Sequence, residues 1–171
     1  FTLNLLNNPR HPVANGGKGP APLPVERRAP GAAADLGWTQ AAGVKSSLRE
    51  QTDVLLSGDG MALEAMKIRS NTVTVHIRND RYLARPEAIG RTSRILTRVL
   101  PASIETFIIV PIENGIPLSA VTVNRSDIEN LEHGADGAWQ SYARADIQDA
   151  ADSLDGSTYH EGRYPKLTWS L

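Results

Sequence analysis

The spacing of apolar and polar residues predicts two pairs of β-strands separated by a helix. Residues 72–78 form the clearest strand, because β-branched apolar residues alternate there with polar ones. Val73, Val75 and Ile77 share one face of this strand, and its polar residues share the other. Residues 62–68 precede it as a second strand, with a turn between the two.

Apolar residues at helical spacing predict two longer helices. The first is expected to run from Thr39, as its cap, to about Ser57. The second is expected to begin at Pro86, because proline suits a first helical turn, and to stop at Pro101.

Two more strands follow the second helix. Residues 106–110 are apolar at consecutive positions, which predicts a central strand with both faces partly covered. Residues 118–123 are expected to form the fourth strand. Asn114-Gly115 is a turn signal, and Pro117 close behind it predicts a loop longer than two residues.

The last predicted element is a short helix through Leu131, with Ser126 and Glu129 as a capping box. The element order is therefore α-β-β-α-β-β-α. This order predicts an α+β fold, a two-layer sandwich in which helices pack on a mostly antiparallel four-stranded sheet. Val75 and Leu96 are each central to an apolar face, so both are expected in one core between the sheet and a helix.

Composition divides the chain into three parts, residues 1–36, 37–132 and 133–171. The first is rich in proline and glycine and is expected to be an extended, weakly ordered linker, with a ligand segment for a partner's groove as the alternative. The second is the α+β domain. The third is acidic, and its aspartates at intervals of three predict a helix with an acidic face or a solvated loop: Asp146, Asp149, Asp152 and Asp155.

Both ends of the chain have the pattern of single β-strands. Residues 1–5 and 166–171 alternate with period 2, and neither has an obvious partner strand. Isolated strands are not stable. Because the chain also begins at Phe1 rather than Met, we expect a piece of a longer protein that carries further β structure.

Composition and charge narrow the class of protein. Apolar residues make up 40% of the chain, which is enough for a buried core. The net charge of −1 argues against a dedicated nucleic-acid binder. The chain contains no cysteine, which excludes disulfides and thiol catalysis, and no apolar run approaches the ~18 residues of a membrane helix.

The search for catalytic and metal-binding motifs is negative, so no enzyme activity, metal or cofactor is predicted. The four histidines form no H-x-x-x-H or H-E-x-x-H pair, and the spaced aspartates do not fit a calcium loop. No phosphate-binding loop, dinucleotide fingerprint or nucleophile elbow is present. His76, on the polar face of its strand, is expected to be a surface or hydrogen-bonding residue.

An arginine cluster between residues 78 and 98 is the one candidate for binding. Arg91, Arg94 and Arg98 are spaced i, i+3, i+7 and are expected to form an exposed stripe on one helix face. With Arg78 they are the candidate binding residues, since guanidinium groups suit phosphates, carboxylates and acidic sugars. A solvated face, or pairing with the acidic segment after Asp127, is the alternative.

Four segments carry a resemblance to a known family. They are TVTVHIRNDRY at 72–82, EAIGRTSRIL at 87–96, FIIVPIENGIP at 107–117 and VTVNRSDIE at 121–129. Through them the chain resembles the YjbH family of bacterial exopolysaccharide and capsule biosynthesis proteins. The resemblance is strongest over about residues 60–132, and its motifs indicate kinship rather than a reaction.

The resemblance implies an outer-membrane β-barrel protein that takes part in exopolysaccharide secretion or assembly with companion lipoprotein and periplasmic proteins. This chain would then be a non-catalytic domain at the periplasmic face of the outer membrane. An alternative is a polysaccharide-binding module that recognises acidic sugars through the arginine face. The few aromatic residues between positions 39 and 131, Tyr82 and Phe107, disfavour sugar stacking, and the lack of recognisable paired carboxylates disfavours a hydrolase or lyase.

Overall fold

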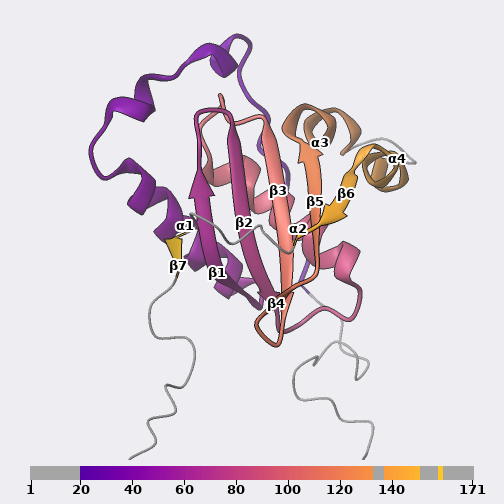
Figure 1. Ribbon diagram of the computed structural model, residues 1–171. Coiled ribbons are helices and arrows are strands. Elements are labelled where there is room, and N and C mark those ends of the chain that lie inside the picture. The colour runs from indigo at the N-terminus through magenta and orange to yellow at the C-terminus, as the bar shows by residue number, and fades with distance from the viewer. Residues whose placement is uncertain (1–19, 133–136, 151–157, 160–171) are drawn as a thin grey trace, which may run out of the picture.

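A computed structural model describes residues 20–132, 137–150 and 158–159 (Figure 1). Two short 3-10 helices, Ala32–Ala34 and Gly37–Gln40, precede the main elements. The helices are α1 Val44–Gly58, α2 Arg85–Val99, α3 Arg125–Leu131 and α4 Gly137–Arg144. The strands are β1 Met61–Ile68, β2 Thr72–Asn79, β3 Thr106–Glu113, β4 Ile116–Pro117, β5 Ser119–Asn124, β6 Asp146–Asp149 and β7 Thr158–Tyr159.

The sheet is mixed and has the strand order β6-β5-β3-β2-β1-β7, with β4 paired to β3 alone. The α+β class is confirmed, but the predicted mostly antiparallel sheet of four strands is wrong. Strands β2 and β3 at its centre are parallel, in register from Thr72↔Thr106 to Ile77↔Pro111. The chain leaves β2 through α2, and this helical crossover returns it to the end where β2 began.

Helices α1 and α2 cover one face of the sheet and enclose the main core (Figure 1). Val73, Val75 and Ile77 of β2 are fully buried there, as the alternation predicts. Leu96 of α2 belongs to the same apolar cluster as Val75, and neither side chain is exposed. The prediction of a shared core between sheet and helix is therefore confirmed.

The turn after β3 is tighter than the sequence suggests. Glu113 pairs with Ile116, so only Asn114 and Gly115 lie in the loop, and the expected longer loop is wrong. Both residues have positive φ, 52° and 81°, as a primed hairpin turn requires. Pro117 closes this short hairpin without breaking it, because the chain only then passes to β5.

The predicted starts of α1 and α3 are displaced, whereas Pro86 lies in the first turn of α2 as expected. Thr39 lies in a 3-10 helix, and α1 begins later, after Gly43. At α3 the capping box does not form, since the cap residue Asn124 makes no side-chain hydrogen bond. Glu105, from the loop before β3, accepts the backbone N–H of Ser126 at 3.1 Å instead. A carboxylate distant in sequence thus satisfies the free donor at this helix end.

Segments outside residues 37–132 also pack on the central unit. Asp146 and Asp149 lie in the edge strand β6, paired with β5, so the expected helix or solvated loop is wrong at these two positions. Asp152 and Asp155 lie outside the described residues, as do the strand-like ends of the chain. In the part of the chain that the structure describes, no helix combines the length and apolarity needed to cross a membrane.

His76 lies on the sheet face opposite Val75 but is completely buried, so the expectation of a surface position is wrong. Burial disfavours the imidazolium and lowers the pKa of His76 to about 4. Glu64 and Arg78 on the same face form an ion pair of 2.6 Å with each other. The histidine is therefore neutral in the folded protein at any pH above about 4.

This burial predicts a loss of stability in mild acid. Between pH 6.5 and 4 the unfolded chain protonates His76 and the folded chain does not, so the free energy of unfolding falls as pH falls. At 1.36 kcal/mol per pH unit, the loss approaches about 3 kcal/mol across this window. Urea unfolding of the wild type and of His76→Gln at pH 7, 6 and 5 separates the contribution of His76 from that of the other titrating groups. If the free energy of unfolding falls equally with pH in the two proteins, His76 does not cause the loss.

Candidate functional site

Three arginines of α2 hold a segment of the chain's own N-terminal part. We call residues 20–28 the strap; they form neither helix nor strand. The guanidinium groups donate to strap carbonyl oxygens in sequence order: Arg91 to Pro20 at 2.7 Å, Arg94 to Leu23 at 3.4 Å and Arg98 to Pro24 at 3.4 Å. The side chains predicted to form one stripe do so, and that stripe faces the strap.

The strap's backbone amides are bound as well. Val25 donates to a carboxylate oxygen of Glu132 at 3.0 Å, and Glu26 donates to the hydroxyl of Thr97 at 3.1 Å. Arg28 donates its amide to Glu129 at 3.3 Å. Helix α2 thus contributes donors and a hydroxyl, and the end of α3 contributes carboxylates. Together they satisfy an extended chain along its length.

Arg28 anchors the end of the strap. Its guanidinium contacts Glu105 at 2.6 Å and Glu129 at 3.0 Å, and only 12% of its side chain is exposed. Burial alone would raise the pKa of Glu105, but hydrogen bonds from Ser126 and Arg28 hold it below its usual value. Glu105 is therefore ionised at neutral pH, and both glutamates bind the strap through charge-assisted hydrogen bonds.

A second arginine, Arg125, is buried beside this anchor. It donates to the carbonyl oxygens of Thr97 at 2.6 Å, Leu100 at 3.1 Å and Pro101 at 3.0 Å, and also to Glu129 at 3.0 Å. These carbonyls terminate α2, where no further turn of helix can satisfy them. Arg125 therefore closes the end of α2 and fixes α3 against it.

Arg91 differs most from its predicted surroundings. It also contacts Asp59 at 3.2 Å and Glu87 at 3.1 Å, and it lies 4.4 Å above the ring of Tyr82. Its side chain is 8% exposed, so the expectation of full exposure is wrong for this residue. Arg94 and Arg98 are 28% and 35% exposed and pair with Glu132 and Glu26. Pairing with the segment after Asp127 is therefore found only at Arg94, and the other two arginines pair with carboxylates elsewhere in the chain.

Tyr82 connects Arg91 to the rest of the core. Its hydroxyl donates to Asp59 at 2.6 Å, and its side chain is completely buried. Burial, and then the hydrogen bond to Asp59, raise the pKa of Tyr82 far above its ordinary value. The phenol is therefore a permanent donor here and has no role as an acid or base near neutral pH.

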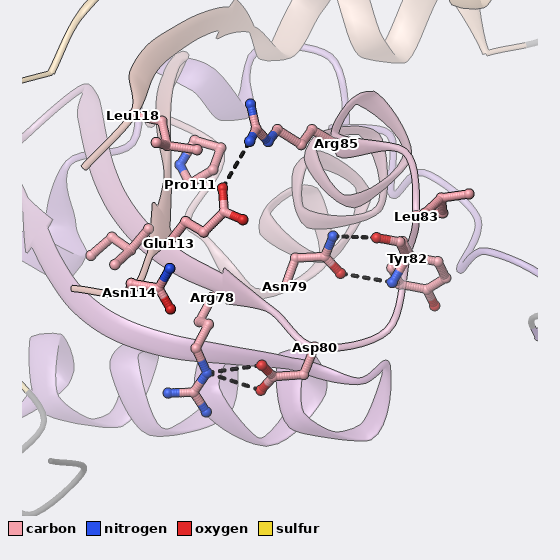
Figure 2. Close-up of a pocket in the computed structure, with 11 residues that line it drawn as sticks. Arg78, Asn79, Asp80, Tyr82, Leu83, Arg85, Pro111, Glu113, Asn114 and Leu118 are labelled. Carbon is pink, nitrogen blue, oxygen red and sulfur yellow. Dashed lines mark hydrogen bonds and ion pairs between the residues drawn. The ribbon is translucent and has the colours of Figure 1, made fainter. Parts of the chain in front are cut away.

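Arg78 lies away from the stripe, in a pocket of about 230 Å³ where β2 and β3 end (Figure 2). It pairs with Glu64 at 2.6 Å and Asp80 at 2.9 Å. On the opposite wall Arg85 pairs with Glu113 at 2.8 Å. The pocket is lined by Arg78, Asn79, Asp80, Tyr82, Leu83, Arg85, Pro111, Ile112, Glu113, Asn114 and Leu118. The structure therefore does not join Arg78 with the other three candidate residues.

Two arginines and two carboxylates line this pocket, Arg78 with Asp80 and Arg85 with Glu113, so it is polar but electrically balanced. Asn79 does not point its amide into the space for a ligand, because it donates to the carbonyl of Tyr82 at 2.6 Å and accepts its N–H at 2.8 Å. Chemically, the pocket offers paired donors and acceptors to a hydroxyl-bearing molecule and no unopposed cation to an anion. Among the residues described, no three of His, Asp and Glu are grouped to hold a metal ion.

Comparison with known protein families shows to which family this chain belongs. A family model described as exopolysaccharide biosynthesis protein YbjH, of the YjbH family, matches residues 1–171, the whole chain. The chain belongs to the YjbH family. No curated protein and no solved structure matches the chain. Membership in YjbH gives this chain a part in exopolysaccharide biosynthesis and confirms the resemblance that the four sequence segments carry.

Sequence reasoning about this YjbH chain missed the strap as the partner of α2. The signal was present in part, since Pro20, Pro22 and Pro24 favour an extended segment with few internal hydrogen bonds. Such a segment needs outside partners for its carbonyls, and an arginine stripe supplies them. The sequence does not reveal the pairing of the strap with α2, because about 70 residues separate the two elements along the chain.

Proposed function

We propose that this chain is a non-catalytic domain at the periplasmic face of the outer membrane, within a protein that secretes or assembles exopolysaccharide. Membership in the YjbH family supports the exopolysaccharide role. Companion lipoprotein and periplasmic proteins are the proposed partners. The domain's part is to hold the strap against α2 and α3, as its contacts with Arg91, Thr97 and Glu129 support.

The strap is the observation that carries this proposal. Arg91, Arg94 and Arg98 bind the main chain of the same polypeptide, and Arg28 is enclosed by two carboxylates. Charged groups that catalyse or bind substrate are poised toward an open space. Here they connect two parts of one chain, which suits a domain that holds chain segments in place rather than one that performs a reaction.

The acidic-sugar alternative is less well supported on this helix face. A polyanion site needs cations whose charge is not already balanced, yet each of the three α2 arginines contacts a carboxylate: Asp59 and Glu87, Glu132, and Glu26. The proposal therefore assigns the stripe to the strap.

Arg28→Ala in the full-length protein tests this role, with its exposed neighbour Arg27→Ala as the matched control. Arg28→Ala removes both ion pairs of the anchor, so we expect released polysaccharide to fall several-fold at an unchanged protein level. Arg27→Ala should leave release normal. Normal release from Arg28→Ala would count against the proposal. Incubation with the purified chain should also leave the length of the exported polymer unchanged. Shortening of the polymer would show that the chain is an enzyme.

Periplasmic placement has a separate test. Val54 on α1 is 64% exposed, and this chain has no cysteine. In the full-length protein, Val54→Cys should react in intact cells with a maleimide that passes the outer membrane but not the inner one. Reaction only after the inner membrane is opened would contradict the placement.

A further inference from the structure

Helices α2 and α3 present polar side chains that bind an extended peptide, and we call this strap-binding surface the α2/α3 groove. Its donors, Arg91, Arg94 and Arg98, bind three carbonyls of the strap. Its acceptors bind three amides of the strap. Main-chain recognition on both sides, with a pocket for one side chain, is how proteins bind extended peptides.

The acceptors around Arg28 give this groove selectivity. Glu105 and Glu129 enclose the guanidinium of Arg28, and the carbonyl of Ala102 accepts from it at 3.2 Å. A planar cation with several donors fits these acceptors better than the single ammonium of lysine does, and a neutral side chain would form neither ion pair. The groove thus selects an extended segment that places an arginine between Glu105 and Glu129, as the strap does with Arg28.

The strap itself is held almost entirely by polar contacts. None of its residues is buried, and Leu23 remains 36% exposed. No core residue comes from the strap. Release therefore costs hydrogen bonds and ion pairs, many of which water can replace, and leaves the apolar core intact. Such an element opens far more readily than the whole domain unfolds.

The connector after the strap allows it to reach a neighbour. Arg28 contacts Ala102, and Trp38 donates to Ser103 at 2.8 Å, so both ends of residues 29–37 lie close together. Figure 1 shows the chain between the strap and α1 standing away from the sheet. Nine residues extend to roughly 30 Å, enough to cross to an adjacent molecule.

We propose that the α2/α3 groove also accepts the strap of a second copy of this chain, so that two copies exchange straps. The strap of a second copy has the same sequence, so it makes every contact in the groove that the chain's own strap makes. Exchange therefore keeps all hydrogen bonds and ion pairs between strap and groove. Exchange of an identical element across a connector is a low-cost route to association. The partner is thus another molecule of this chain.

Disulfide trapping tests the exchange, because the chain has no native cysteine. The amide of Glu26 lies 3.1 Å from the hydroxyl oxygen of Thr97. One tagged chain carries Glu26→Cys and a differently tagged chain carries Thr97→Cys. After mixing and mild oxidation we expect a heterodimer with a 26–97 disulfide, whose yield rises with protein concentration. Arg28→Ala on the strap-donating chain should cut the yield about fivefold, while Arg27→Ala should not.

Val54→Cys, on the exposed side of α1, replaces Thr97→Cys as the matched control and should give no specific heterodimer. Absence of the 26–97 link, or equal yields for the two positions, would overturn strap exchange. If Thr97→Cys does not fold, Val25→Cys with Glu132→Cys probes the neighbouring contact under the same criteria. The trapping uses purified chain, so its failure would leave the proposed function standing.

Discussion

Replacing Arg125 with methionine should cost about 3–5 kcal/mol of unfolding free energy, the loss typical when one partner of a buried ion pair is removed. Arg125 is 3% exposed and satisfies three carbonyl oxygens as well as Glu129. Methionine fills a similar volume but donates no hydrogen bond, so the buried carbonyl oxygens of Thr97 and Leu100 would lose the donor that Arg125 supplies. Chemical unfolding in urea measures the loss as a shift of the midpoint.

Arg85→Met is the matched control for this substitution. Arg85 also pairs with a glutamate, but its side chain is 61% exposed and that of Glu113 is 58% exposed. Solvent screens this pair, so its loss should cost no more than about 1 kcal/mol. A cost below about 1 kcal/mol for Arg125→Met would show that α3 does not depend on this arginine to close the end of α2.

Leu96→Ala should destabilise the fold by about 2–4 kcal/mol. Leu96 has no exposed surface and lies in the cluster that α1, α2 and the sheet enclose. Truncation removes buried apolar area and leaves a cavity that rigid neighbours only partly fill. Thermal or urea unfolding against the wild type gives the value.

Leu83→Ala provides the comparison, because Leu83 is 73% exposed beside the N-terminus of α2. The same atoms are deleted there without a cavity, so the change should stay within about 0.5 kcal/mol. Similar costs at both positions would mean that the assigned core is wrong.

Local pattern predicted the individual elements well, because side-chain period is a local property. The alternation over residues 72–78 corresponds to β2, and Pro86 and Pro101 bracket α2 as expected. Strand direction is not local. The order of strand pairs and helices favours an antiparallel sheet, whereas the crossover through α2 makes β2 and β3 parallel.

The candidate site was predicted only in part, for a related reason. Helical spacing correctly places Arg91, Arg94 and Arg98 on one face, because i, i+3 and i+7 are fixed by helix geometry. Their partners depend on tertiary contacts, so neither the strap nor Asp59 could be read from the spacing. His76 illustrates the same limit, since a polar residue on a strand's second face is exposed only if nothing covers that face.

Hydrogen exchange at the strap's bound amides tests most directly the claim that the α2 arginines serve the chain's own strap. The amides of Val25, Glu26 and Arg28 should exchange at least about tenfold more slowly than in a free peptide, because each donates to the groove. In Arg91→Gln/Arg94→Gln/Arg98→Gln their protection should fall toward the free rate, while that of Ile109 in β3 is unchanged. Free-peptide exchange of the strap amides in the wild type would contradict the claim.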